Sequence, residues 1–454
     1  MRQIGVLLLL TAFIPGFASG AAEWAKEFGG ATLDETVTTV LQTEDGGFIA
    51  GGNVFDEKAD RNYALVIKLD ASGTILWQKR YSSKTLAVFV TVVLPAPDGG
   101  YLVVAWAFDA KNEDLSYGFL MKIDANGKQK WQKRYSPPNA SGIFYTARET
   151  PDGGYIATGF LQEPIGSEKS AGWIVKVDGA GAVQWQRRYS TTHGCGLFYA
   201  EQTSDGGYIA AGAITVSSTT GDGDAWIVRL GSSGELVWQK RYGSKLTGDG
   251  LLTVRQTADG GYVAAGYYAD DGEDSSAAWI VKLDAAGTVK WQKACGGKYY
   301  DYNFFVDPTT DGGYVTSGLT GLTAESLNAS IMRFDAAGTL LWRRTLKGGF
   351  QGLAFTVRQT PDGGYVSGCY ATASEDDSNG IVLKLNSSGN ISTACGSLLG
   401  TDKLTVSNTS TKALNTTGTT TNTSASLATT DFKPYSSKAT TKTLCESMDL
   451  EYLE

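Results

Sequence analysis

The repeat pattern of this 454-residue sequence predicts an all-β fold, a seven-bladed β-propeller of four-stranded antiparallel blades closed by an N-terminal strand. Two markers, an Asp-Gly-Gly tripeptide and a Trp, each recur seven times with a period of 51 to 54 residues. Periods of this length are typical of propeller blades. The tripeptides begin at Asp45, Asp98, Asp152, Asp205, Asp259, Asp311 and Asp362, and the Trp marker is at Trp24, Trp77, Trp131, Trp185, Trp238, Trp291 and Trp342.

Residues 1–20 have the pattern of a secretory signal peptide. Arg2 provides a positive start, residues 4–14 are apolar, and residues 18–20 are the small residues of a cleavage site. The apolar stretch is too short for a stable membrane span, and a retained membrane anchor is the alternative. We therefore expect export to the periplasm, the extracellular medium or the cell surface, with no transmembrane segment after signal removal.

Residues 251–294 illustrate one repeat. The runs 251–256 and 262–265 flank the Asp-Gly-Gly turn, and the runs 279–283 and 288–293 flank an Asp-Ala-Ala-Gly turn. Short β-rich runs between such turns predict strands joined as hairpins. We expect a tight two-residue hairpin with positive φ angles at Asp-Gly, and a type I turn at Asp-Ala-Ala-Gly. Both turns are interpreted as structural and not as ligand sites.

The propeller is expected to span residues 21–396 and to close on itself. Residues 24–30 are an extra copy of a fourth strand that precedes the first Asp-Gly-Gly, whereas the last repeat, at 390–395, lacks its Trp. The N-terminal strand is therefore expected to complete the seventh blade, which removes an exposed sheet edge.

The fourth strand of each blade is expected to be its outer edge. It reads Trp-Gln-Lys-Arg-Tyr at 77–81 and 131–135, and Lys and Arg discourage pairing with another chain. Residues 397–454 form the third segment and are rich in Ser, Thr and Asn, which is typical of a solvated tail, a surface stalk or a small β module stapled by cysteines. Cys395 and Cys445 bracket this segment and are the candidate disulfide. Because the chain has five cysteines, at least one stays free or pairs between chains.

The stretch from Leu283 to Trp291, Leu-Asp-Ala-Ala-Gly-Thr-Val-Lys-Trp, resembles the tryptophan-docking motif of quinoprotein-type propellers. The strand spacing is also similar to kelch repeats, and the Asp-Gly-Gly-Tyr repeats resemble secreted bacterial propellers of mostly unassigned function. The resemblance covers roughly residues 22–396 and implies a fold rather than a chemistry. Quinoprotein dehydrogenases use two adjacent cysteines at the cofactor, and this chain has no such pair. We therefore expect no bound quinone and no other cofactor.

Composition argues against several other classes. The net charge of −8 and the pI near 5 disfavour a nucleic-acid partner. His193 is the single histidine and lies in a loop, so two-histidine metal sites are excluded and a serine triad is disfavoured. Acidic loops at 222–224, 270–271 and 375–377 make Ca²⁺ conceivable, but none has the spacing of a calcium loop, and no metal site is expected.

Two neighbouring loops are unusually aromatic and are the candidate ligand-binding surface. Tyr side chains combine a large apolar ring with a hydrogen-bonding tip, which suits a glycan or a protein. The alternative is that these residues pack within their own loops. The candidate residues are Tyr267, Tyr268, Asp270, Asp271, Tyr299, Tyr300, Asp301 and Tyr302.

A second candidate lies four residues before each Asp-Gly-Gly, on the expected inner strands. This position is Leu41 and Leu94 in the first two repeats and is charged, with alternating sign, in the other five. Because neighbouring repeats are neighbours in a ring, we expect the charged side chains to form an Arg–carboxylate network at the central channel, either locking the blades or binding a small anion. They are Arg148, Glu201, Arg255, Asp307 and Arg358.

These patterns predict an exported, monomeric binding or scaffold module that contacts a glycan or a protein through its long loops. One alternative is a glycan-active hydrolase or lyase that uses carboxylates of the same face. The other is a structural protein of the cell surface. No catalytic residue is assigned.

Overall fold

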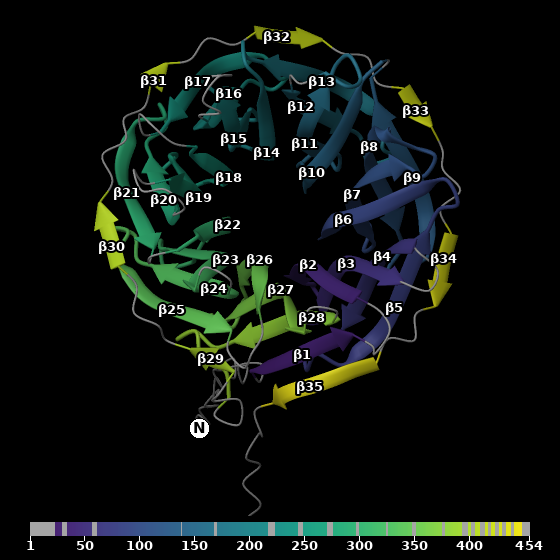
Figure 1. Cartoon of the computed structure of the whole chain (residues 1–454), viewed down its shortest axis with the longest axis vertical. Helices are drawn as coiled ribbons and strands as arrows, with labels where there is room; N and C mark the ends of the chain where they lie inside the picture. Colours follow the sequence, from purple (N-terminus) through teal and green to yellow (C-terminus); the bar gives the residue numbers. More distant parts are fainter. Residues whose placement is uncertain are drawn as a thin grey trace, which may run out of the picture.

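The computed structural model confirms the all-β fold, with seven four-stranded antiparallel blades arranged in a ring (Figure 1). The structure describes residues 23–29, 34–56, 61–137, 139–167, 170–216, 223–243, 248–269, 276–296, 299–323, 326–346, 351–374, 377–392 and 398–400, together with short segments of the C-terminal region.

Each of the first six blades uses four consecutive strands, ordered from the centre of the ring outward. Blade 1 contains β2 (Asp34–Gln42), β3 (Phe48–Asp56), β4 (Arg61–Leu69) and β5 (Ile75–Ser82). Blade 2 contains β6 (Leu86–Pro95), β7 (Tyr101–Asp109), β8 (Asn112–Ile123) and β9 (Gln129–Ser136). Blade 3 contains β10 (Ser141–Glu149), β11 (Tyr155–Gln162), β12 (Ser170–Val177) and β13 (Val183–Ser190).

The remaining blades repeat this arrangement. Blade 4 contains β14 (Cys195–Gln202), β15 (Tyr208–Thr215), β16 (Gly223–Leu230) and β17 (Leu236–Tyr242). Blade 5 contains β18 (Gly250–Gln256), β19 (Tyr262–Ala269), β20 (Ser276–Leu283) and β21 (Val289–Gly296). Blade 6 contains β22 (Asp301–Pro308), β23 (Tyr314–Thr323), β24 (Ser326–Phe334) and β25 (Leu340–Leu346). Blade 7 contains β26 (Gln351–Gln359), β27 (Tyr365–Ser374), β28 (Asp377–Leu385) and β1 (Trp24–Gly29).

Blade 7 joins the two ends of the repeat array. Its outermost repeat strand is β1, which pairs antiparallel with β28 from Trp24 opposite Lys384 to Phe28 opposite Gly380. Trp24 and Phe28 are buried in the same cluster as residues of blades 1 and 7.

The Asp-Gly-Gly turns differ in one respect from the expected two-residue hairpin. Thr257 N–H donates to the Gly261 carbonyl across 2.9 Å, which closes a loop of three residues. Within the described residues, Gly260 alone takes a positive φ in this loop, at 76°. A type I turn followed by a left-handed Gly is the usual three-residue alternative. The Asp259 carboxylate accepts from Gly261 N–H at 3.1 Å and from the Thr257 hydroxyl at 2.5 Å.

The same Asp also holds a buried cation in every blade. In blade 5, Lys282 Nζ of the third strand lies 2.9 Å from Asp259 Oδ2, and the Lys side chain is only 6% exposed. A buried ammonium group needs such a partner. The equivalent pairs are Asp45–Lys68, Asp98–Lys122, Asp152–Lys176, Asp205–Arg229, Asp311–Arg333 and Asp362–Lys384. The turn is therefore structural, as its sequence indicates, and each carboxylate secures the third strand of its own blade.

The repeated Trp joins each blade to the next. The ring of Trp238 in blade 4 lies against Gly287 in the Asp-Ala-Ala-Gly turn of blade 5, so that a Cβ on this glycine would come within 2.8 Å of the indole. The Tyr242 hydroxyl donates to the Gly287 carbonyl at 2.7 Å. Each of the seven repeated Trp side chains makes the same approach, to Gly73, Gly127, Gly181, Gly234, Gly287, Gly338 and Gly389. This is the contact expected from the docking motif.

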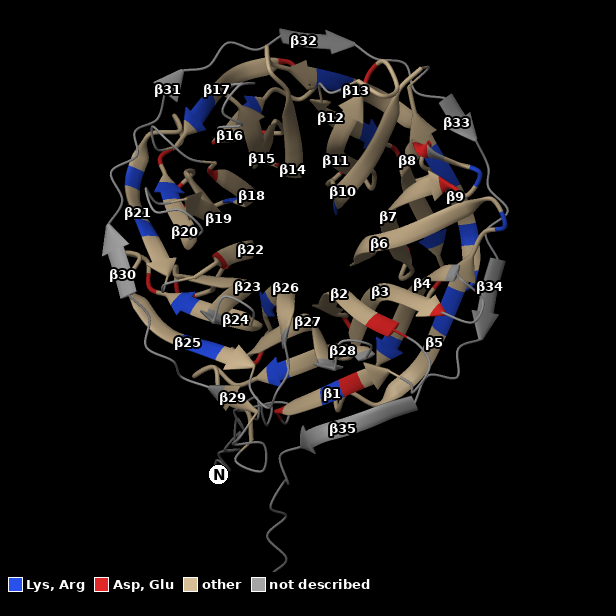
Figure 2. Cartoon of the chain, in the orientation of Figure 1, with Lys and Arg blue, Asp and Glu red and all other residues tan. Residues whose placement is uncertain are grey.

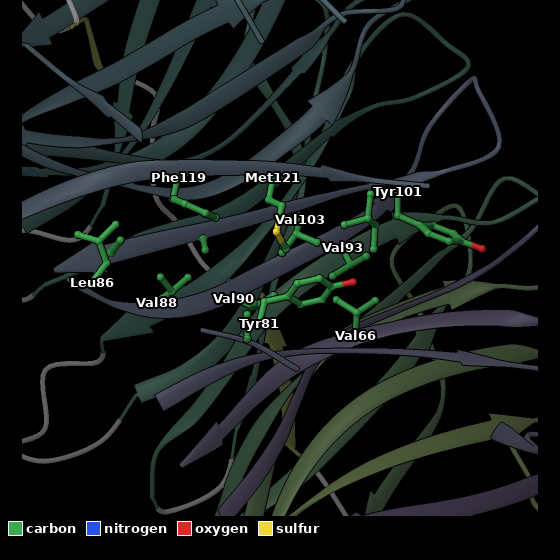
Figure 3. Close-up of a cluster of buried hydrophobic side chains, with 14 of the residues drawn as sticks. Val66, Tyr81, Leu86, Val88, Val90, Val93, Tyr101, Val103, Phe119 and Met121 are labelled. Carbon is green, nitrogen blue, oxygen red and sulfur yellow. The ribbon is translucent and has the colours of Figure 1, made fainter. Parts of the chain in front are cut away.

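The hydrophobic core lies between adjacent blades. Figure 3 shows the cluster between blades 1 and 2, where Val66 and Tyr81 of one blade face Val93, Val103 and other apolar side chains of its neighbour. Seven clusters of buried apolar residues occur in the described part of the chain. Burial at each blade interface supplies the main favourable term for closing the ring.

The C-terminal region adds an outer strand to every blade, which the sequence did not predict. After blade 7 the chain reverses and passes around the ring from blade 6 to blade 1, and then to blade 7 (Figure 1). Its strands pair antiparallel with β25, β21, β17, β13, β9, β5 and β1 in turn. We call them the belt strands: β29 (Leu399–Gly400), β30 (Thr405–Asn408), β31 (Leu414–Asn415), β32 (Thr419–Asn422), β33 (Ser426–Ala428), β34 (Lys433–Ser436) and β35 (Thr440–Glu446).

The belt strands correct two expectations. The fourth strands are not the outermost ones, because a belt strand pairs with each of them. The described belt strands also do not gather into a separate β module. Ser, Thr and Asn can pair through their backbones in a strand without supplying a core of their own, so composition alone does not distinguish a tail from an added strand. Lys and Arg are nevertheless concentrated along the fourth strands (Figure 2).

In the part of the chain that the structure describes, no helix is long and apolar enough to cross a membrane.

Candidate ligand-binding site

A cavity of about 600 Å³ lies where the inner strands of all seven blades face one another. Its volume is within the usual range for small-molecule sites. About half of its lining residues are aromatic, and the described lining contains no Asp, Glu, Lys, Arg, His or Cys. The aromatic lining residues are Phe89, Trp106, Tyr145, Phe198, Tyr199, Phe304, Phe305, Phe355 and Tyr370.

A β-bulge in each inner strand builds this lining. In all seven inner strands the pairing register shifts at the residue seven positions before the Asp of Asp-Gly-Gly. A bulge places two residues opposite one and re-aims a side chain. We call the seven bulged residues the bulge ring, and all of them line the cavity: Thr38, Thr91, Tyr145, Phe198, Leu252, Phe304 and Phe355.

Sequence reasoning missed the bulge ring because it assumed strict alternation along the inner strands. With alternation, Phe304 and Phe305 would face opposite sides, yet both line the cavity. The sequence does contain a signal for the bulge ring. It appears when the seven repeats are aligned on Asp-Gly-Gly and the seventh position before the Asp is compared. Four of its seven copies are aromatic.

Aromatic contacts link bulge-ring residues of neighbouring blades. The rings of Tyr145 and Phe198 meet edge to face with centroids 5.2 Å apart, and those of Phe304 and Phe355 stack at 5.9 Å. Burial raises the pKa of Tyr145 to about 12, so its hydroxyl is a neutral donor at physiological pH.

Asn53 and several Thr side chains of the lining are already bonded to backbone groups. Asn53 donates to the Val90 carbonyl at 3.2 Å and accepts from Val90 N–H at 2.7 Å. Thr253 donates to the Phe304 carbonyl at 2.6 Å. Thr38 and Thr91 likewise donate to backbone carbonyls. A ligand rich in hydroxyls would therefore find few unoccupied partners among the Asn and Thr side chains, whereas an apolar surface would find many aromatic ones.

The predicted charged residues lie directly beyond this cavity. Thr146, Tyr199, Thr253, Phe305 and Thr356 line it, and each charged residue follows one of them by two positions on the same strand, which puts it on the same face. We call Arg148, Glu201, Arg255, Asp307 and Arg358 the charge row.

The structure brings four members of the charge row together. Arg255 Nε lies 2.6 Å from Glu201 Oε2, and Arg255 Nη1 lies 2.5 Å from Asp307 Oδ1. Arg358 also pairs with Asp307 Oδ1. These four side chains are 12–18% exposed. Burial alone would lower the pKa of Arg255, but Tyr199, Glu201 and Asp307 outweigh it, and the pKa is raised.

Arg148 is placed differently from the other four. Its guanidinium lies over the Tyr199 ring, 5.9 Å from the centroid, and among the described residues it forms no ion pair. The next residue, Glu149, is exposed and, by strand alternation, points to the other face. Three guanidinium groups and two carboxylates leave the charge row with one positive charge in excess. Consistent with this excess, burial together with Arg148 and Arg255 lowers the pKa of Arg358 to about 10, against the opposing effect of Asp307.

The candidate ligand-binding residues were expected on loops, but Tyr267 and Tyr268 lie in β19, and Asp301 and Tyr302 lie in β22. Most of the described members are engaged in packing. Tyr268 contacts Trp279 with ring centroids 5.7 Å apart, and Tyr267 contacts Tyr302 at 4.9 Å. Tyr302 in turn stacks on Phe304 of the bulge ring at 6.4 Å. This aromatic series connects one predicted loop to the cavity.

The other loop residues fall into three groups. Tyr300 is 36% exposed, whereas Asp301 is buried and lies 3.6 Å from Arg343. Tyr299 is half-buried. Asp270 and Asp271 lie outside the described residues, as do residue 222, residues 375–376 and Cys395 of the candidate disulfide. Cys445 pairs through its backbone with Ala25.

Side chains that could hold a metal ion do not cluster in the described residues. These residues contain no group of three or more His, Cys, Asp or Glu side chains that could hold a metal ion. His193 is exposed. Cys195, Cys295 and Cys369 are buried free thiols, and burial raises the pKa of each.

Comparison with known families adds one relation. Residues 16–195 match the family model described as outer membrane protein assembly factor BamB, which covers less than half of the chain. Together with the seven docking Trp residues, this match supports one conclusion. The ring is similar to propellers of the quinoprotein type. No curated protein matches the sequence.

Similar solved structures share only a distant likeness. A puromycin hydrolase variant complexed with PGG is 14% identical, with a TM-score of 0.41, and the match covers 77% of this chain and 53% of that one. A puromycin hydrolase is 13% identical, with a TM-score of 0.34 and coverage of 75% and 59%. A eukaryotic initiation factor is 8% identical, with a TM-score of 0.29 and coverage of 71% and 96%. The chain thus spans just over half the length of the two hydrolases.

Proposed function

We propose that this chain is an exported binding module whose ligand occupies the central cavity. The observation that carries the proposal is the bulge ring, because a bulge at the same position of seven strands directs side chains from every blade into one space. A site built on strands is held more rigidly than one built on loops. The signal-like N-terminus and the match to an outer membrane assembly factor support export.

The apolar lining favours binding over hydrolysis at this site. Glycoside hydrolysis uses two carboxyl groups beside the scissile bond, and the described lining has none. The nearest carboxylates of the charge row, Glu201 and Asp307, are both ion-paired to Arg255.

The proposal is tested by screening the mature protein against peptide and glycan arrays and against a library of small aromatic and aliphatic compounds. We expect hits whose affinity falls at least tenfold in Phe355→Ser, which makes the lining polar. Val237→Ser is the matched control, because Val237 is 59% exposed on an outer strand. Hits that bind Phe355→Ser and wild type equally would place the ligand elsewhere.

In the same screen, Tyr300→Ala distinguishes binding at the predicted loop surface from binding in the cavity. Tyr300 is the exposed member of the predicted aromatic set. The Tyr300→Ala variant should therefore lose a ligand that binds the loops and keep one that binds the cavity. Loss of every hit in Tyr300→Ala, with none lost in Phe355→Ser, would move the site to the loops.

A further inference from the structure

The cavity and the charge row together indicate the chemistry of the ligand. The cavity offers aromatic surface, and its Asn53, Thr38, Thr91 and Thr253 side chains are bonded to backbone groups. An apolar body is therefore the part of a ligand that this lining accommodates best. The remaining question is which polar group, if any, such a ligand carries.

Arg148 is the side chain best placed to bind a polar group of the ligand. It lies two residues beyond Thr146, which lines the cavity, and on the same face of β10. Toward blade 4, the carboxylate of Glu201 is ion-paired with Arg255. Toward blade 2, the equivalent position is Leu94, which is buried and apolar. Arg148 thus has an apolar neighbour on one side and an occupied carboxylate on the other.

The charge balance of the charge row also favours an anionic group at Arg148. The row holds three guanidinium groups, and its two carboxylates are shared between Arg255 and Arg358. A half-buried guanidinium that lies over an aromatic ring and forms no ion pair among the described residues retains donors for an anion. One negative charge from a ligand would balance the row, whereas two would not be matched.

We propose that the cavity binds a small amphipathic monocarboxylate, with its apolar body within the bulge ring and its carboxylate on Arg148. The proposal rests on the proposed binding function and specifies the substrate class of the same site. Arg is suited to this role, because its planar donors match a carboxylate in a bidentate pair.

Two probes of equal size test the charge requirement. 2-Naphthoate carries an aromatic body and one carboxylate, and 2-naphthalenemethanol has the same ring system without the charge. By calorimetric titration, we expect wild-type protein to bind naphthoate about 10- to 100-fold more tightly than the alcohol. Equal affinity for the two probes, or no binding of naphthoate, would overturn the proposal.

Variants at Arg148 locate the charge recognition. Arg148→Gln should abolish the preference for naphthoate and leave the affinity for the alcohol within about twofold, and Arg148→Lys should restore part of the preference. Lys130→Gln removes one positive charge from an exposed position and should change neither affinity. Melting temperatures of all variants report whether the fold is retained.

The outcomes separate this proposal from the binding function. If Phe355→Ser weakens both probes while Arg148→Gln changes neither, the cavity binds ligands and the role of Arg148 is wrong. If naphthoate binds as tightly to Arg148→Gln and to Phe355→Ser as to wild type, both the anion site and the cavity are wrong for this probe class. A free acid and the C-terminal carboxylate of a short apolar peptide share this chemistry, and titration with Phe-Phe-Phe and its C-terminal amide distinguishes them.

Discussion

At the scale of single residues, the charge row shows how one position acquires different roles in different blades. Blades 1 and 2 have Leu41 and Leu94 there; Leu41 packs against the apolar cluster between these blades, and Leu94 is buried. In blades 4 to 7 the same position forms a continuous series of ion pairs centred on Arg255. Because buried carboxylates must be compensated, Arg255 is the residue on which Glu201 and Asp307 both depend.

Replacing Arg255 should therefore be costly. Arg255→Leu leaves Glu201 without a charged partner and Asp307 with only Arg358, so we expect a loss on the order of 3 kcal/mol in the free energy of unfolding. Denaturant unfolding monitored by Trp fluorescence measures it.

The matched control is Arg148→Leu, which makes the same substitution at the same position two blades away. Arg148 forms no ion pair among the described residues, so its loss should cost clearly less. Equal destabilisation by the two substitutions would contradict the asymmetry of the charge row.

At the scale of elements, the two hairpin turns of each blade perform different tasks. The Asp-Gly-Gly turn works within its blade, where its carboxylate neutralises a buried Lys or Arg of the third strand. Burial raises the pKa of Asp45, but hydrogen bonds from Thr43 and Lys68 outweigh it and lower the pKa to about 2. The Asp-Ala-Ala-Gly turn connects two blades, because the Trp ring of the preceding blade lies against its Gly.

This difference predicts unequal effects of the same substitution in the two turns of blade 5. Gly260 and Gly287 have φ angles of 76° and 75°, so Ala imposes a similar backbone strain on each. A Cβ at Gly260 meets nothing within 4 Å, whereas a Cβ at Gly287 comes within 2.8 Å of Trp238. Gly287→Ala should lower the free energy of unfolding by about 1–3 kcal/mol more than Gly260→Ala.

Chemical denaturation of both variants tests the docking contact, with Gly260→Ala as the control for backbone strain. Equal losses of stability would show that the Trp238 contact does not constrain this turn.

At the scale of the whole molecule, the ring is closed in two ways. Strand β1 occupies the fourth position of blade 7, and the belt strands then pass around the outside and end on β1 itself. Every fourth strand thereby has a hydrogen-bonded neighbour on its outer side. Without such a neighbour, the unpaired edge of a fourth strand would favour association with other chains.

Removing the belt strands should expose all seven edges. A chain ending at residue 396 should associate, as measured by size-exclusion chromatography with light scattering, because seven sheets then have unpaired N–H and C=O groups. Its fourth strands should also lose amide protection in hydrogen exchange, since they lose their outer partners.

Deletion of residues 447–454 alone is the control, because it leaves β35 and its pairing with β1 intact. A monomer ending at residue 396 with unchanged exchange in β5, β9 and β13 would show that the belt strands protect nothing.

The sequence by itself determined the number of blades, the positions of the turns and the docking residues. Each depends on a local signal that recurs in every repeat: an Asp-Gly-Gly turn, a second turn that ends in Gly, such as Asp-Ala-Ala-Gly at 284–287, and a Trp. It also singled out the positions of the charge row, because a ring makes sequence neighbours into spatial ones. For example, Arg255 and Asp307 are 52 residues apart and form an ion pair.

Only the tertiary structure decided where the inner strands bulge, that Arg148 remains outside the ion pairs of the described residues, and where the belt strands lie. A bulge depends on the pairing of the inner strand with the second strand, and it breaks the alternation of side chains between the two faces of the sheet. Because this alternation was assumed, Phe304 and its equivalents were not recognised from the sequence as cavity residues. The belt strands pair through their backbones with strands up to some 400 residues away, such as β1, and backbone pairing leaves little trace in side-chain composition. Features fixed by repeated local chemistry can be read from one chain, whereas features fixed by distant backbone contacts require the folded ring.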